Sequence, residues 1–241
     1  VLPPTGGTAS GFSAIDEAYP GAPTVPAHPN FQTGDIYMKL TGAPFRLWVA
    51  ALTGTGISTG YSATSTKYVS VKIVDNSDNA CGTDAARTCN AACTNKAAVE
   101  AGATQIATFA SGGTTGVASP LPTFTLNSAW KNLIAGMKEC TTSACTAFTA
   151  TAPACSADSF SVRPTGVTVT SSNATNAGMG GTPIFKAGND TFNLTAAIAG
   201  IAGNPSRYTG ILKINSAAIQ PLAPATVLGT LSSSVFPAAV S

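Results

Sequence analysis

The chain has 241 residues, enough for one large or two small domains and for a core that needs no covalent staples. Only 9% of the residues are charged, against about a quarter in an average soluble protein, and the net charge is +2. The basic residues are scattered and form no stripe that could neutralise phosphates, so we expect no nucleic-acid partner. The longest apolar runs, 47–52 and 194–203, are shorter than the roughly 18 residues of a membrane helix, so we expect no membrane span.

The cysteines indicate export, and so does the start of the chain if Val1 is a processed N-terminus. Val1 stands where an initiator Met would, which indicates a processed N-terminus or an artificial boundary. An even number of cysteines accompanies a single histidine, a pattern typical of disulfides in an oxidising compartment. The disulfide candidates are Cys81, Cys89, Cys93, Cys140, Cys145 and Cys155. Their connectivity stays open, because spacing does not choose among the possible pairings.

Alternating apolar residues predict β-strands along the whole chain. In 35–40 the residues expected on the buried face are Ile36, Met38 and Leu40, and the same period of two continues in the next segments. A first set of predicted strands covers 35–40, 45–52, 67–74, 104–110 and 122–127. A second set covers 159–172, 182–188, 191–198, 208–214 and 225–231. Short strands separated by Gly, Pro and Ser are typical of sandwiches or barrels.

An internal repeat divides these strands into two units. The residues of the first copy are Phe45, Leu47, Ala51 and Tyr61, and those of the second are Phe192, Leu194, Ile198 and Tyr208. The offset between the two copies is constant, which is the sign of a duplicated structural unit. The sequence therefore predicts an all-β protein of two tandem immunoglobulin-like β-sandwich domains, 1–157 and 158–241.

Between the strands, the Ala-rich segment 84–102 fits a short helix. Its cysteines favour a stapled loop instead. Cys155 falls where the first repeat ends, so we expect a bond from it back to the group between Cys81 and Cys145, which would clamp the last strand of the first domain.

Few residues are suited to catalysis or to binding a metal. His28 is the sole histidine and lies among prolines, which favours a rigid loop over a catalytic pair. The segment 75–84 has oxygen-bearing residues at calcium-loop spacing, with Asp75, Asp78 or Asp84 as ligands, but it lacks the Gly and Glu of such a loop. Cys89 and Cys93 have zinc-ligand spacing, yet no second short-spaced pair completes a set. We expect no catalytic residue, no metal and no cofactor.

Two surface features suggest contacts. Trp48 is expected on the outer face of its strand, opposite Phe45 and Leu47, where it could stack on a sugar or pack on a partner or on a segment of its own chain. Triplets that could accept glycans begin at Asn173, Asn189 and Asn193.

Longer motifs resemble one protein family. The segments 155–164, 170–183 and 186–196 resemble successive motifs of MshQ-like bacterial surface proteins, which are associated with biogenesis loci of mannose-sensitive-haemagglutinin-type pili. The segments 35–52 and 69–75 resemble the preceding module of the same family. The resemblance implies β-rich modules and an extracellular or outer-surface location, and it implies no reaction.

These features together predict a non-enzymatic structural protein of the bacterial surface. A subunit of a filament, pilus or sheath would self-associate by donating a terminal strand to a neighbour's sheet edge, and the candidate donors are 1–15 and 225–241. Each end could equally complete its own domain. The first alternative is an adhesin that binds surface glycan through Trp48 or a loop. The second is a secreted hydrolase that uses Asp75, Asp78 or Asp158.

Overall fold

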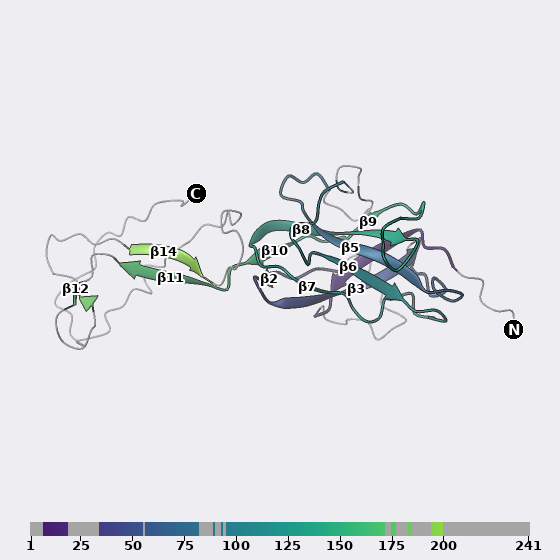
Figure 1. The fold of residues 1–241 in the computed structure, drawn as a ribbon, viewed down its shortest axis with the longest axis horizontal. Coiled ribbons are helices and arrows are strands. Elements are labelled where there is room, and N and C mark those ends of the chain that lie inside the picture. The colour runs from purple at the N-terminus through teal and green to yellow at the C-terminus, as the bar shows by residue number, and fades with distance from the viewer. Residues whose placement is uncertain are drawn as a thin grey trace.

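The computed structural model shows a protein built from β-strands (Figure 1). It describes residues 7–18, 34–54, 56–81, 89, 93, 95–171, 175–176, 183–184 and 194–199. The elements formed by these residues are all strands, which confirms the all-β prediction.

One sheet is built around a long strand near the N-terminus. Strand β3 (Pro44–Thr53) pairs antiparallel along most of its length with β1 (Gly11–Asp16). It also pairs with β4 (Gly56–Ile57) at one end and with β7 (Thr123–Thr125) at the other. The N-terminal segment therefore completes a sheet of its own chain.

The other sheet is centred on β8 (Trp130–Cys140), which pairs with strands on both sides. Its order is β2 (Lys39–Leu40), β10 (Phe160–Arg163), β8, β5 (Lys67–Asp75) and β6 (Thr104–Phe109). The short strand β9 (Ala154–Cys155) also pairs with β8.

The two sheets enclose one large core. Leu47 of the first sheet and Val71 and Leu133 of the second are fully buried in the same cluster. An aromatic group fills it further, with Phe45 stacked on Phe124 at 5.5 Å and meeting Phe160 edge-on at 5.8 Å between ring centroids. One sheet, with β1, β3 and β7, thus packs face to face on the other, with β5, β6, β8 and β10. Strands that follow one another along the chain are shared between the two sheets, as they are in immunoglobulin-type sandwiches.

The strongest alternating segments form the strands that were predicted. In β3 the side chains of Phe45, Leu47, Val49 and Ala51 are buried, and Val69, Val71 and Ile73 are buried in β5. β6 and β7 also lie within predicted segments. A period of two is reliable where one face meets the core and the other meets solvent.

The prediction for 35–40 is wrong in most of its length. Only Lys39 and Leu40 form a strand, and Met38 and Leu40 are each 46% exposed, although Ile36 is buried. The amide of Ile36 donates to Asp158 Oδ2 at 2.8 Å, and the amide of Tyr37 donates to Asp16 Oδ2 at 2.9 Å. Carboxylate side chains accept the backbone hydrogen bonds that a neighbouring strand would otherwise accept. The alternating residues of this segment therefore do not form a strand before Lys39.

The segment 159–172 forms two strands instead of one. Phe160 and Val162 of β10 are buried in the core of the sandwich, where β10 pairs with β8 and β2. After Pro164 the chain continues as β11 (Gly166–Ser171). Proline has no N–H to donate to a sheet, so the ladder ends there.

Beyond Pro164 the structure describes two small strand pairs. β11 pairs antiparallel with β14 (Leu194–Ala199), and β12 (Thr175–Asn176) pairs with β13 (Pro183–Ile184). In Figure 1, β11 and β14 lie side by side outside the two-sheet body. The predicted strands 208–214 and 225–231 lie outside the described residues, so the second sandwich stays a prediction.

Candidate functional site

The six cysteines form three disulfides, which confirms the predicted chemistry. The bonds join Cys81 to Cys93, Cys89 to Cys155 and Cys140 to Cys145. Their Cα–Cα distances of 4.6, 5.1 and 4.9 Å lie in the normal range for a disulfide. Cys155 of β9 is bonded back to the segment between β5 and β6, as expected.

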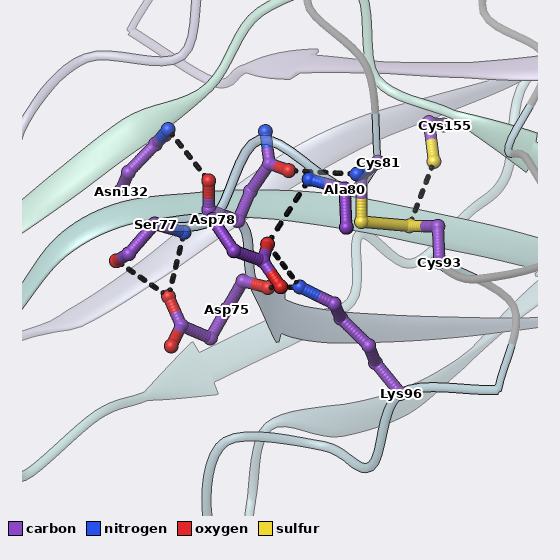
Figure 2. Close-up of polar contacts among 10 residues, drawn as sticks. Asp75, Ser77, Asp78, Ala80, Cys81, Cys93, Lys96, Asn132 and Cys155 are labelled. Carbon is purple, nitrogen blue, oxygen red and sulfur yellow. Dashed lines mark hydrogen bonds and ion pairs between the residues drawn. A yellow bond between two sulfur atoms is a disulfide. The ribbon is translucent and has the colours of Figure 1, made fainter.

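Two of the bridges meet in one cluster. Cys93 Sγ lies 3.4 Å from Cys155 Sγ, although these two atoms belong to different bonds (Figure 2). We call Cys81, Cys89, Cys93 and Cys155 the cysteine cluster. Its side chains pack with Val74 of β5 and Ile134 of β8, on the face of the sheet that points away from the main core. The cluster therefore forms a second, smaller core outside the sandwich.

A turn after β5 leads the chain into this cluster. The side-chain oxygen of Asn76 accepts a hydrogen bond from the Cys81 amide at 2.9 Å, and the amide of Asn76 donates to the Asn132 carbonyl at 2.9 Å. Asn79 has a φ of 55°, a left-handed conformation that asparagine tolerates well. These bonds fix the entry of the loop at a side chain that is fully buried.

Lys96 closes the loop from the other side. Its Nζ donates to the Asp75 carbonyl at 2.6 Å and to Asp78 Oδ1 at 2.5 Å (Figure 2). The hydrogen bond from Lys96, followed by that from the Ala80 amide, holds the pKa of the Asp78 carboxyl below its usual value. The Lys96 ammonium group is thus paired with Asp78, one of the carboxylates that the calcium hypothesis named as ligands.

The remaining acidic candidates in the described residues accept hydrogen bonds from the protein itself. Asp75 Oδ1 accepts hydrogen bonds from the amide and the hydroxyl of Ser77, at 2.9 and 2.6 Å. The carboxylate of Asp158 accepts the amides of Ile36 and Ser159, each at 2.8 Å. Backbone and side-chain donors therefore account for these carboxylates. His28, Asp84 and the glycan-acceptor asparagines lie outside the described residues.

A second polar site lies at the end of β8. Glu139 Oε2 accepts hydrogen bonds from Thr149 Oγ1 at 3.0 Å and Thr151 Oγ1 at 2.7 Å, and Lys67 Nζ lies 3.8 Å from Oε1. Burial alone raises the pKa of this carboxyl, but its donors outweigh burial and hold the pKa below the usual value. Burial, followed by the neighbouring Glu139 carboxylate, raises the pKa of the Tyr61 phenol. The Tyr61 hydroxyl is buried and has no partner at normal hydrogen-bond distance and angle among the described residues.

Trp48 lies on the outer face of β3, as predicted, and is half-buried. Like the half-buried Ile57, it packs against a small buried apolar cluster made of Ile15, Ala50, Leu52 and Val117. Its indole N–H is buried and has no hydrogen-bond partner among the residues the structure describes. This packing accounts for an apolar side chain on the outer face of β3. A contact between Trp48 and a ligand or partner stays a prediction.

Sequence reasoning did not single out Asn76, Lys96 or Glu139. Asn76 and Glu139 are almost fully buried polar residues, and burial of that kind needs partners brought from distant segments. The sequence offers little local signal for them: Asn76 comes two residues after the predicted strand 67–74, Lys96 comes three residues after Cys93, and Glu139 precedes Cys140.

Comparison of the chain with protein-family models, with curated proteins and with solved structures finds no match. The resemblance to MshQ-like proteins therefore stays a prediction. In the part of the chain described here, no helix is long and apolar enough to cross a membrane.

Proposed function

We propose that this chain is an exported structural protein of the bacterial cell surface. Its copies associate by adding a strand of one chain to a sheet edge of the next, as a filament, pilus or sheath requires. Two observations support export: all six cysteines are in disulfides, and charged residues are few. Disulfides persist in oxidising compartments, which for a bacterium means the periplasm or the outside.

The outer edge of β6 is the observation that carries the proposal. β6 ends the strand order of its sheet and extends over six residues, Thr104–Phe109. It contains no charged residue and no proline, and Ile106 is 39% exposed. Its own chain meets this edge at Thr108, whose carbonyl accepts the Ser119 amide at 3.0 Å. Natural edge strands are usually protected by charge, proline, a bulge or shortness, because an unprotected edge pairs with another chain. The opposite edge, β2, is two residues long and has Lys39.

The C-terminal segment is the donor we favour. Its residues 225–231 alternate in the way that an added strand requires, with one side chain in two entering a neighbour's core. The N-terminal candidate is already paired, because β1 lies along β3 of its own chain. A strand in that position completes its own sandwich.

A charge placed on the β6 edge tests the proposal. We expect the wild-type chain to form multimers that grow with concentration, seen by light scattering and negative-stain electron microscopy. Ile106→Lys should remain monomeric, because a buried lysine at the junction is costly. The matched control is Phe148→Lys, which replaces an apolar residue that is 45% exposed elsewhere, and it should assemble like the wild type. A monomeric wild type, or equal assembly of both variants, would contradict the proposal.

The alternatives remain separate proposals with their own tests. A glycan-binding adhesin would lose binding on a glycan array when Trp48 is changed to alanine. A secreted hydrolase would turn over a polysaccharide and lose that turnover in Asp75→Asn, Asp78→Asn or Asp158→Asn. No contact in the described residues favours either one over assembly.

A further inference from the structure

The cysteine cluster gathers four sulfur atoms that the sequence keeps apart. The Sγ atoms of Cys89, Cys93 and Cys155 all lie within 4.8 Å of one another. The fourth sulfur, that of Cys81, is bonded directly to Cys93. Two disulfides can hold a loop without their sulfur atoms lying this close together. The closeness of the sulfurs therefore suggests a further chemical property of the cluster.

Three sulfurs at this spacing suit a zinc–thiolate site, and Cys81, which is bonded to Cys93, is placed to supply a fourth ligand. Zn–S bonds are about 2.3 Å long, which puts the sulfurs of a tetrahedron roughly 3.8 Å apart. The Cys93 and Cys155 sulfurs are 3.4 Å apart, close to that spacing, and the two sulfurs within each bridge would have to move apart to reach it. Sequence spacing disfavoured zinc because only Cys89 and Cys93 form a short pair. The sheet supplies the missing ligand by bringing Cys155 on β9 beside them.

The loop that carries these ligands is also held by contacts that do not depend on the bridges. Lys72 Nζ donates to the Lys96 carbonyl at 2.5 Å, and the Lys96 amide donates to the Cys93 carbonyl at 3.1 Å. On the other side, Asn76 holds the Cys81 amide. None of these bonds involves a sulfur atom, so the backbone positions of Cys81 and Cys93 do not depend on the bridges alone, which favours a replacement crosslink.

We propose that in the reduced chain the cysteine cluster binds one zinc ion, which takes the place of two disulfides. A dithiol reductant gives two electrons and two protons to each bridge and is itself oxidised to a disulfide, which leaves four thiols. Zinc then binds four thiolates and releases the four protons to water, so the affinity for zinc rises with pH. The apolar surroundings, Val74 and Ile134, keep competing water away from the thiolates. This inference does not depend on the proposed self-association.

The test uses the full chain without any substitution. The protein is reduced with a dithiol under anaerobic conditions, freed of reductant and titrated with zinc against a chromophoric chelator. We expect one equivalent of zinc to bind the reduced protein and none to bind the oxidised protein. Zinc should then slow alkylation of the cysteine cluster while Cys140 and Cys145 react at the rate of the metal-free chain. Equal zinc uptake by both forms, no uptake, or protection that ignores this division would overturn the proposal.

Matched variants place the ligands. The double variant Cys140→Ser/Cys145→Ser should bind zinc like the wild type, because that bridge lies outside the cluster. Adding Cys155→Ser to this background should weaken zinc binding by at least the 10- to 100-fold that loss of an outer-shell partner costs. Cobalt bound in place of zinc should show tetrahedral absorption and thiolate charge transfer in the background and weaker charge transfer in the triple variant. Unchanged affinity and spectra in the triple variant would rule out Cys155 as a ligand and with it the site as proposed.

Discussion

Gly116 lies where the chain passes the end of β3, and its carbonyl accepts the Ala51 amide at 2.8 Å. Its φ is 66°, in the left-handed region, and a Cβ built there would come within 2.4 Å of the Ser58 carbonyl oxygen. Gly112 has a similar φ of 75°, but its Cβ would meet nothing within 4 Å. An added Cβ would cause backbone strain at both positions, but it would also clash with neighbouring atoms only at Gly116.

Gly116→Ala should destabilise the protein by at least about 3 kcal/mol, because strain and an atomic clash add up. Gly112→Ala should cost only about 1 kcal/mol, the strain of a left-handed alanine. Urea unfolding of both variants measures the difference. Equal losses would show that the contact with Ser58 relaxes freely.

Glu139 is the buried acid whose ionisation contributes to stability. Its folded-state pKa lies below the usual value, so its stabilising effect is present above about pH 4.3 and is lost as the pH falls through the folded pKa. Glu139→Gln should lower the free energy of unfolding at pH 7 by about 1.5–3 kcal/mol, since hydrogen bonds to a charged acceptor are weakened. The deficit should shrink below about pH 4.

The control for Glu139 is Glu17→Gln, which removes an exposed pair with Arg46. Exposed pairs contribute about 0–1 kcal/mol, so this variant should unfold almost like the wild type. A neutral Glu139→Gln at pH 7, or an equal deficit at pH 3 and pH 7, would contradict the role given to the carboxylate.

At the scale of elements, β10 decides how far the first sandwich extends. It contributes Phe160 and Val162 to the core and pairs with two other strands. A chain that ends at residue 165 keeps this strand, and one that ends at 157 lacks it. The shorter chain loses a buried phenylalanine, an interaction worth about 3–5 kcal/mol, together with the β2 pairing.

We expect the chain that ends at 165 to unfold cooperatively on heating and the chain that ends at 157 to be largely unfolded. Circular dichroism and limited proteolysis distinguish the two results. If both chains melt at the same temperature, the first sandwich ends before β10 and the sequence boundary at 157 is the better one.

Strand β8 shows why part of the fold escaped prediction. Leu133, Ala135 and Met137 face the main core, while Ile134 between them packs with the cysteine cluster. Both faces are buried, so alternation between apolar and polar residues disappears, although the strand pairs on both sides. β3 and β5 were predictable because their outer faces are less uniformly apolar. The alternation is thus missing from β8 because the disulfide-bonded cysteine cluster covers the second face of the strand.

At the scale of the whole molecule, composition predicted the class of protein better than it predicted the site. Few charges, many short strands and an even set of cysteines were enough to indicate an all-β, disulfide-bonded chain. The convergence of two bridges was not predictable, since it depends on β9 pairing with β8 and on a bond between residues 66 apart. Contacts of that range are set by tertiary pairing, which local spacing does not encode.

The bond between Cys89 and Cys155 has a mechanical consequence. It spans 66 residues, which include β6, β7 and β8. A fully stretched residue covers about 3.3–3.6 Å, so the closed bond withholds roughly 220 Å of contour length from a chain pulled at its ends. In a polymer under tension each subunit would therefore stop extending roughly 220 Å short of the length that its unfolded chain could reach, and reduction of that one bond would release this length.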